Sequence, residues 1–252
     1  MKKKILKSKI SITNLVNLNA DVLNYLKKKI KRKSFYICVS AVHSCIEAFK
    51  SKRFLKSHNT SDISVPDGRP LYWILRLSGY NKSTHLPGYL VTENLLKLSS
   101  KENLRIGIYG STKNVIKNFK KVVKKKYNNL NIVFSQPHPH SIVSNTKHNL
   151  TIKTINKKKV DILFVCLGCP LQENWMYSNR FKLKLVMIGI GAAIDFISGN
   201  KLLAPKFLEK LGLAWLFRLI TEPRRLFWRY FSTNFLFIFL LFLQITGLKK
   251  FK

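Results

Sequence analysis

The stretch DILFVCLGCPLQENWM, residues 161–176, decides the fold of this 252-residue chain. Its first part, Val160–Leu167, is a nearly continuous apolar run, which is typical of a strand buried on both faces of a parallel sheet. A loop with Gly168 and Pro170 follows, and the sequence predicts a helix from Gln172. A strand that passes through a glycine loop into a helix is the repeating unit of α/β proteins.

The same pattern recurs on both sides of this stretch. Further strands are predicted over 35–42, 104–109, 131–135 and 185–190. Helices are predicted over 20–33, over 43–49, after Ser111-Thr112 and over much of 202–230, and a turn over 64–68 precedes an apolar segment at 71–77. Strands that alternate with helices predict an α/β fold, a mostly parallel sheet with helices on both faces. Ligands of such sheets lie beyond the carboxyl ends of the strands.

Charge restricts the kind of partner. The chain has 46 Lys and Arg against 11 Asp and Glu, a net charge of +35, yet 46% of its residues are hydrophobic. So large an apolar fraction excludes a disordered chain, and the charge indicates nucleic acid or an anionic membrane surface. The charge is uneven, because residues 161–200 are neutral and residues 201–252 carry a net +8. We therefore expect buried chemistry in the neutral segment.

The cysteines and the N-terminus indicate the compartment. Cys38, Cys45, Cys166 and Cys169 are too few for a disulfide framework in a chain of this length, and we expect them to be buried and reduced, as in the cytosol. The first ten residues, MKKKILKSKI, have no long apolar stretch and no small-residue cleavage site. We therefore expect no signal peptide.

The C-terminal part is aromatic and basic. The unbroken apolar run Phe235–Leu243 has nine residues, whereas a bilayer-spanning helix needs about 20. A spanning helix would have to include Gln244 and Thr246, and a final core helix is an alternative. We favour a segment in the membrane interface, because aromatic and Arg side chains together suit the headgroup layer. The residues concerned are Trp215, Phe217, Phe227 and Trp228, with Arg218, Arg224, Arg225 and Arg229.

Several residues are candidates for chemistry. Asp67, in VPDGRP, is either an ordinary turn residue or a general base in a strand-to-helix loop. Gly110 precedes a helix start that could hold a diphosphate, and Gly189 and Gly191 lie where a backbone approaches a ligand or a neighbouring helix. His138 and His140 favour a polar loop over a metal site, and we expect no metal.

Taken together, these blocks resemble the WecG/TagA/CpsF family of bacterial glycosyltransferases over roughly residues 35–248. The resemblance is carried by ICVSAVHSCIEA (37–48), VPDGRPLYWILRLSGY (65–80), the Tyr109-Gly110 loop, DILFVCLGCPLQENWM (161–176), VMIGIGAAIDFISGN (186–200) and APKFLEKLGLAWLFRLITEPRRLFWRY (204–230). These blocks occur in the order that the family has them.

The resemblance implies an inverting transfer of N-acetylmannosamine, its uronic acid or a related hexose from a UDP donor to a polyprenyl-diphosphate-linked N-acetylglucosamine. Such transfers build cell-surface polysaccharides, among them teichoic acid and enterobacterial common antigen. It also implies a Rossmann-like catalytic domain, here residues 1–200, and a helical membrane-associating appendage, residues 201–252. No cofactor or metal is implied. The expected location is the cytoplasmic face of the bacterial plasma membrane, as a peripheral protein. Self-association, which occurs in the family, stays open.

The resemblance also assigns roles to residues. Asp67 matches the family's base, and Arg218, Arg224, Arg225 and Arg229 match basic positions suited to the diphosphates of UDP and lipid. The remaining residues expected to bind substrate are Ser40, Pro66, Gly68, Gly110, Gly168, Gln172, Glu173, Gly191 and Asp195.

Two departures from the family pattern bear on specificity. Val39 and Ala41 stand where the family usually has Thr and Asn, so a hydroxyl and an amide are missing unless Ser40 replaces one of them. Trp228 stands where a basic residue is common. A family member that binds lipid or a partner without catalysis is therefore one alternative. A nucleic-acid-binding protein, suggested by charge alone, is a weaker one, and we expect no nucleic acid as partner.

Overall fold

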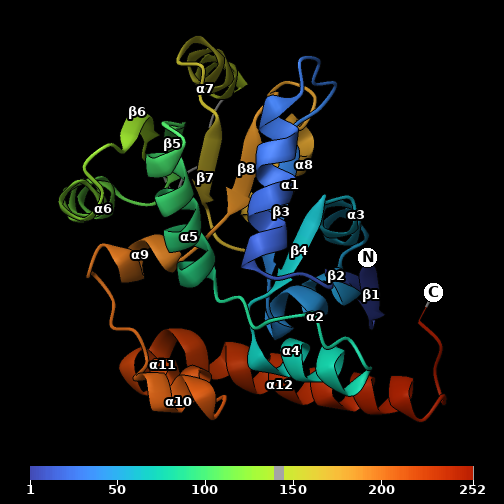
Figure 1. The fold of residues 1–252 in the computed structure, drawn as a ribbon. Helices are drawn as coiled ribbons and strands as arrows, with labels where there is room; N and C mark the ends of the chain where they lie inside the picture. The colour runs from blue at the N-terminus through green and yellow to red at the C-terminus, as the bar shows by residue number, and fades with distance from the viewer. Residues whose placement is uncertain (139–144, 252) are drawn as a thin grey trace.

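The computed structural model describes residues 1–138 and 145–251. Its centre is a six-stranded parallel sheet in the order β4-β3-β8-β7-β5-β6, with helices on both faces (Figure 1). The strands are β3 (Phe35–Ser40), β4 (Ile63–Pro66), β5 (Arg105–Gly110), β6 (Asn131–Gln136), β7 (Ile162–Cys166) and β8 (Val186–Gly189). The predicted α/β fold class is confirmed.

Strand β7 shows why this sequence forms the centre of the sheet. All five of its residues are buried, and it pairs with β5 on one side and β8 on the other. Because side chains alternate along a strand, Phe164 packs into the core on one face of the sheet and Leu163 into the core on the other. Truncating Phe164 to Ala is expected to cost about 3–5 kcal/mol of stability.

Helices complete the two faces and the lower edge. One face carries α1 (Leu15–Lys27), α5 (Gly88–Lys101), α6 (Lys113–Lys126) and α9 (Ala193–Ile197). The other carries α3 (Lys52–Asn59), α7 (Asn145–Lys157) and α8 (Leu171–Asn179). Two more helices, α2 (Val42–Lys50) and α4 (Arg69–Leu77), lie below the carboxyl ends of β3 and β4 (Figure 1).

Three local expectations differ from the structure. Residues 1–11 form an antiparallel hairpin, β1 (Lys2–Ile5) and β2 (Ser8–Ser11), which the sequence analysis did not predict. Helix α1 begins at Leu15 and ends at Lys27 instead of covering 20–33, because the Asn14 side chain caps its start and Lys28 has extended backbone angles. Residues 63–66 form a strand where a turn was expected; Pro66 is tolerated there because β4 is an edge strand.

Residues 202–251 form three helices under the sheet (Figure 1). The expected helical stretch 202–230 is divided into α10 (Lys206–Lys210), α11 (Ala214–Thr221) and the start of α12 (Pro223–Ile245), with breaks at Gly212 and at Glu222-Pro223. The apolar run Phe235–Leu243 is thus the second half of one helix. We call residues 202–251 the appendage.

Helix α12 has two different faces. Leu226, Phe237 and Leu240 are buried; Phe237 and Leu240 pack in a cluster that includes α2, α4 and the hairpin. The opposite face exposes Phe235 and Phe242. By length and composition alone, this helix of 23 residues could cross a membrane, and 22% of its most apolar window is buried. In this structure it lies along α2 and packs against α4 and the hairpin.

Candidate active site

The carboxyl ends of β3, β4, β7 and β8 meet at the edge of the sheet that faces the appendage (Figure 1). Asp67 directly follows β4, and its backbone N–H donates to the Ser40 carbonyl at 2.9 Å. Pro66 closes the strand, and Gly68 is the N-cap of α4. The Pro-Asp-Gly segment is therefore a strand-to-helix loop at the ligand-binding edge.

Two neighbours hold Asp67. The backbone N–H of Gly88, the first residue of α5, donates to Asp67 Oδ1 at 2.6 Å. The ring of His85 donates from Nε2 to the Asp67 carbonyl oxygen at 2.6 Å. No hydrogen bond between described residues takes up Asp67 Oδ2. One carboxylate oxygen is thus fixed and the other is left for a ligand.

The electrostatics of this pair suit a base. Burial raises the pKa of Asp67 above its usual value, and the Gly88 N–H, His85 and Arg218 oppose that rise. Burial also lowers the pKa of His85, so its ring is neutral near pH 7 with the proton on Nε2. A carboxylate with a raised pKa takes up a proton more readily than an exposed one, as a general base must.

Gln172 lies at the floor of the site beside the β8 loop. Its Oε1 accepts from the Gly191 N–H at 3.0 Å, and its Nε2 donates to Glu173 Oε1 at 3.0 Å. A Cβ on Gly189 would lie 2.8 Å from Gln172 Nε2, which explains the glycine at that position. The Gly189-Gly191 pattern thus reflects close approach of helix α8. Gly168 lies next to Gly191, since a Cβ on Gly191 would be 3.9 Å from Gly168 Cα.

Glu173 lies deeper. Its side chain is buried, and burial raises its pKa to about 7. Within the described chain its Oε2 has no hydrogen-bond partner. Glu173 therefore holds the Gln172 side chain through the hydrogen bond to its Oε1, and its own carboxyl group is buried away from solvent.

The four predicted arginines divide into two pairs. Arg218, on α11, and Arg229, on α12, each have a buried Nε with no partner among the residues described. Burial lowers the pKa of Arg229, and the positive charges of Arg225 and Arg218 lower it further. Arg225 instead binds Glu222 Oε2 at 2.7 Å, and Arg224 is exposed. Buried Nε–H donors without partners, in a place where positive charges are crowded, favour an anionic ligand.

The remaining predicted residues lie around this centre or away from it. Asp195 is in the first turn of α9, and burial raises its pKa while Lys201 opposes the rise. Gly110 has a φ of +108° and lies close to β7. A Cβ on Gly110 would lie 2.7 Å from the backbone of Cys166, so a larger residue would clash there. This glycine thus has a packing role. Thr112 then caps α6.

Ser40 does not replace the missing hydroxyl at the site. It is fully buried, and its Oγ lies 2.7 Å from both His58 Nε2 and Ser64 Oγ. Because side chains alternate along β3, Val39 points the other way, and its Cγ1 would lie 3.2 Å from a Cβ on Gly88. Next to Asp67 the chain therefore presents Val39 and Ala41, which bring no hydrogen-bonding side chain.

All four cysteines are free, and three of them are buried, as expected. Among the described residues, no group of three or more His, Cys, Asp or Glu could hold a metal ion. His138 lies 5.6 Å from Tyr109, ring to ring, and His140 lies outside the described residues.

Sequence reasoning missed four residues of this site. They are His85, Gly88, Tyr89 and Glu209, and His85 and Gly88 hold Asp67 directly. The motif THLPGY at 84–89 has a Pro-Gly pair that marks a helix start, and Glu209 is one of only 11 acids. Neither signal indicates that Gly88 would bind Asp67 or that Glu209 would bind Tyr89.

The fold and the site define a class before any comparison. A buried carboxylate, Asp67, lies at the carboxyl edge of a parallel sheet, and the positive charge of Arg218 lies close enough to affect its pKa. Such an arrangement suits an enzyme that transfers a group from an anionic leaving group to a hydroxyl acceptor, because the carboxylate can take the hydroxyl proton and the positive charge can stabilise the leaving group.

Comparisons with known proteins give the family. The chain belongs to the WecG/TagA/CpsF family of glycosyl transferases, whose model matches residues 3–251. It is 30% identical to a protein of Bacillus subtilis (strain 168) over 222 residues, 85% of this chain and 84% of the relative. A relative in Bacillus spizizenii is 27% identical over 79% of this chain and 75% of the relative. A relative in Staphylococcus aureus strain NCTC 8325 is 26% identical over 69% of this chain and 66% of the relative. Each of these relatives is named N-acetylglucosaminyldiphosphoundecaprenol N-acetyl-beta-D-mannosaminyltransferase.

Proposed function

We propose that this glycosyltransferase moves N-acetylmannosamine or a related hexose from a UDP donor to an N-acetylglucosamine linked through diphosphate to a polyprenol, in the synthesis of teichoic acid or a similar polysaccharide. The names of the relatives support the acceptor and the sugar class. The observation that carries the mechanism is the position of Arg218, whose buried Nε has no partner among the described residues and whose charge lies close enough to Asp67 to oppose the rise of its pKa.

In the proposed reaction Asp67 removes the proton from an acceptor hydroxyl. The hydroxyl oxygen then attacks the anomeric carbon from the face opposite to UDP, the bond from that carbon to the UDP oxygen breaks, and UDP leaves with the electron pair. Attack from the opposite face inverts the anomeric configuration. Gly88 N–H, bonded to Oδ1, keeps the carboxylate oriented during the step.

Positive charge stabilises the departing diphosphate. Arg218 and Arg229 come from the appendage and have free Nε–H donors within the described structure. Arg225 is held by Glu222 and adds charge at the rim, and Arg224 is exposed. Preorganised donors aimed at developing charge typically contribute about 3–4 kcal/mol each to such a step.

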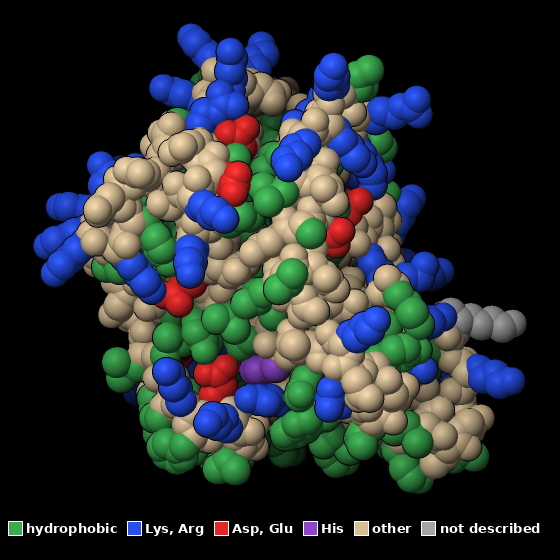
Figure 2. All heavy atoms as spheres, in the orientation of Figure 1, with side chains coloured by type: hydrophobic (Ala, Val, Ile, Leu, Met, Phe, Trp, Pro, Cys, Tyr) green, Lys and Arg blue, Asp and Glu red, His purple; other side chains and the backbone are tan. Residues whose placement is uncertain are grey.

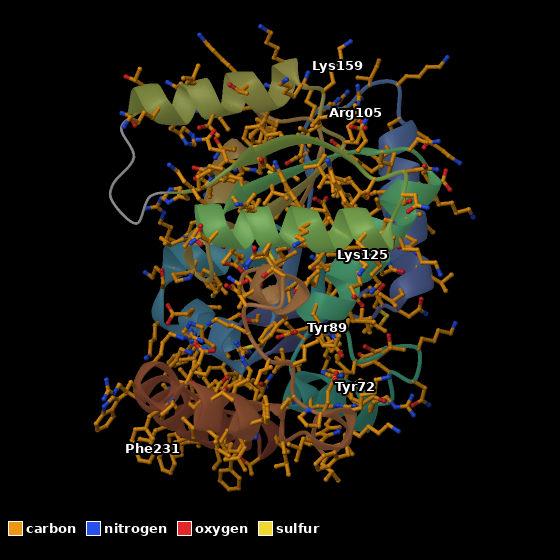
Figure 3. All side chains as sticks on the ribbon, turned by 90° about the vertical axis from the view of Figure 1, so that its left-hand side faces the viewer. Tyr72, Tyr89, Arg105, Lys125, Lys159 and Phe231 are labelled. Carbon is orange, nitrogen blue, oxygen red and sulfur yellow. The ribbon has the colours of Figure 1, made fainter. Side chains whose placement is uncertain are left out.

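The exposed face of the appendage supports attachment to the membrane that carries the lipid acceptor. Hydrophobic side chains line the lower edge of the molecule in Figure 2, where α10–α12 lie in Figure 1. The large exposed ones include Phe207, Trp215, Phe227, Trp228, Phe231, Phe235, Phe239 and Phe242. Figure 3 shows Phe231 at the lower tip, directed away from the rest of the molecule. This face supports the proposed peripheral position, with α12 in the headgroup layer of the cytoplasmic leaflet.

Val39 and Ala41 favour a donor that makes fewer hydrogen bonds to β3 than the family's usual donor does. They also motivate the second candidate, a member that binds lipid without transferring sugar, because a sugar pocket loses discrimination when such groups are absent.

The test is a transfer assay with a panel of radiolabelled UDP-sugars and a short-chain polyprenyl-diphosphate N-acetylglucosamine. We expect one UDP-sugar to be transferred with inversion, and Asp67→Asn to reduce transfer by roughly 10²–10⁴-fold while UDP still binds. No transfer with any donor, but intact lipid binding, would select the second candidate. Near-normal turnover of Asp67→Asn in a native fold would remove the base assignment.

A further inference from the structure

Helix α10 is attached to the catalytic domain in an unusual way. None of its five residues is buried, and Phe207, like the following Leu211, is 63% exposed. Apolar packing therefore does little to hold it. Gly212, just beyond it, lies against the Trp73 ring, since a Cβ there would be 2.5 Å from Trp73 Cη2.

Glu209 supplies the polar attachment of α10. Its Oε2 accepts from the Tyr89 hydroxyl at 2.8 Å, and its backbone carbonyl accepts from Arg69 Nε at 3.0 Å. Its Oε1 lies 3.9 Å from His85 Nδ1, on the ring whose other nitrogen binds Asp67. In Figure 3 Tyr89 and Tyr72 lie just above the appendage, at the junction of the two parts.

The three partners of Glu209 surround the base. Arg69 lies two residues after Asp67 on α4, and Tyr89 follows Gly88, whose N–H holds Asp67 Oδ1. His85 holds the carbonyl of Asp67. One acid of the appendage thus contacts both segments that fix the carboxylate.

We propose that Glu209 is a positioning residue, which couples the docking of α10 to the placement of the Asp67 carboxylate through the hydrogen bond between its side chain and Tyr89. The inference rests on the proposed function, in which Asp67 is the base. With Glu209 in place, the 85–89 segment is tied to the appendage and the Gly88 N–H stays on Oδ1. Without it, that segment and α10 are held by fewer contacts, and the carboxylate loses its fixed direction.

Donor binding should depend much less on Glu209. Helix α12, which carries Arg229, is attached by the burial of its own Leu226 and Phe237. Glu222, between α11 and α12, pairs with Lys201 at 2.7 Å and holds the junction next to α11, which carries Arg218. Loss of the Glu209 contacts should therefore affect the chemical step and not the binding of UDP.

The experiment compares wild type with Glu209→Gln, Glu209→Ala and Tyr89→Phe in the full chain. The matched control is Glu93→Gln, on α5, whose carboxylate pairs with Lys126 at the surface. Three quantities are measured: kcat and KM for the UDP-sugar, the dissociation constant of UDP, and amide hydrogen exchange at Gly88 and over residues 206–211.

We expect kcat to fall by about 10- to 100-fold in Glu209→Ala, because small misplacements of reacting groups have effects of that size. KM and UDP affinity should change by less than about threefold, and exchange at Gly88 and α10 should rise by about tenfold. Glu209→Gln and Tyr89→Phe should show the same pattern more weakly, because each keeps part of the contact set. Glu93→Gln should match wild type.

Unchanged kcat and unchanged Gly88 exchange in Glu209→Ala would overturn the proposal. A general loss of protection across the sheet would also overturn it, because Glu209 would then support the fold and not the base. If wild type transfers no sugar, the proposed function fails, and the hydrogen-exchange data test the role of Glu209 alone. Faster exchange in Glu209→Ala that is confined to α10 and Gly88 supports the coupling between α10 and the Gly88 segment. Unchanged exchange at both places would overturn it.

Discussion

The centre of the sheet and the appendage differ in how far their apolar side chains are buried and in which polar groups have hydrogen-bond partners. In residues 161–200 the strand side chains are buried, and Gln172 makes hydrogen bonds to Gly191 and Glu173. In the appendage, large apolar side chains are exposed, and the buried Nε atoms of Arg218 and Arg229 lack partners among the described residues. The first region also has unpartnered buried atoms, Glu173 Oε2 and Trp175 Nε1 among the described residues, but its apolar strand side chains are buried. The second region exposes large apolar side chains beside its unpartnered Nε–H donors, and we propose that this side of the molecule faces the substrate.

Two glutamates show the same contrast. Burial raises the pKa of Glu173, in the sheet region, to about 7. Hydrogen bonds from Arg225 and Lys201 lower the pKa of Glu222, in the appendage, to about 2. The pKa of a carboxyl group is thus raised by desolvation in one region and lowered by positive charge in the other.

Removing the appendage is expected to have the largest effect. Deletion of residues 205–252 takes away Arg218, Arg229 and the exposed aromatic face. We expect loss of measurable transfer and release from anionic vesicles, checked by the transfer assay and by co-sedimentation. Circular dichroism of the truncated chain serves as the folding control. Unchanged vesicle binding would show that the catalytic domain itself carries the membrane contact.

Removal of one guanidinium should come next. Arg218→Ala or Arg229→Ala is expected to lower kcat/KM by roughly 10²–10³-fold, because each deletes a donor aimed at the leaving diphosphate. Lysine at the same position should restore only part of the activity, since it has the charge but not the forked donors. Arg32→Ala, at an exposed position remote from the site, is the control. Equal activity of Arg218→Ala, Arg229→Ala and Arg32→Ala would contradict the role of Arg218 and Arg229 at the diphosphate.

The two glutamates predict opposite pH effects on stability. The folded-state pKa of Glu173 is raised, so the native protein keeps a proton that the unfolded chain releases, and stability falls as pH rises from about 4.5 to about 7. The expected fall is on the order of 3 kcal/mol, and Glu173→Gln should remove it. Glu222 has a lowered pKa, so its stabilisation is present above pH 4.5 and is lost as pH falls towards about 2. Urea unfolding of wild type and Glu173→Gln at pH 5 and pH 8 tests the Glu173 effect, and a change in unfolding free energy between the two pH values as large in Glu173→Gln as in wild type would contradict it.

Helix α12 allows the smallest and most local test. Phe235 is 75% exposed and Phe237 is 2% exposed, two residues apart on one helix. Phe235→Ser should weaken vesicle binding by about tenfold without changing the unfolding free energy, since its ring is already in water. Phe237→Ala should cost about 3 kcal/mol of stability. If Phe235→Ser destabilised the protein and left vesicle binding intact, the outer face would be a packing surface.

The sequence predicted the parts of this molecule that depend on local pattern. The apolar run ending in Gly168 indicated β7, and the Pro-Asp-Gly loop placed Asp67 between a strand and a helix. Strand β4 was missed because its four residues include Ser64 and Pro66, which are typical of turns away from a sheet edge. The withdrawal of Ser40 from the site follows from partners at 58 and 64 that no local pattern indicates.

Contacts between distant segments could not be predicted in the same way. Tyr89 and Glu209 are 120 residues apart, and their hydrogen bond depends on how the appendage folds back under the sheet. The family resemblance suggested that the appendage completes the site, but not which of its acids meets the catalytic domain.

The distribution of lysine along the height of the molecule has a consequence for how it sits on a surface. Figure 3 shows Lys159 at the end of the molecule opposite to Phe231, and Figure 2 shows Lys and Arg crowded over that upper end. A strand of five residues is about 17 Å long, roughly twice the distance over which physiological salt screens charge. With the exposed face of α12 in the headgroup layer, as proposed, the upper lysines are too far from the headgroups to contribute to attachment. Their positive charge instead repels neighbouring copies of the protein.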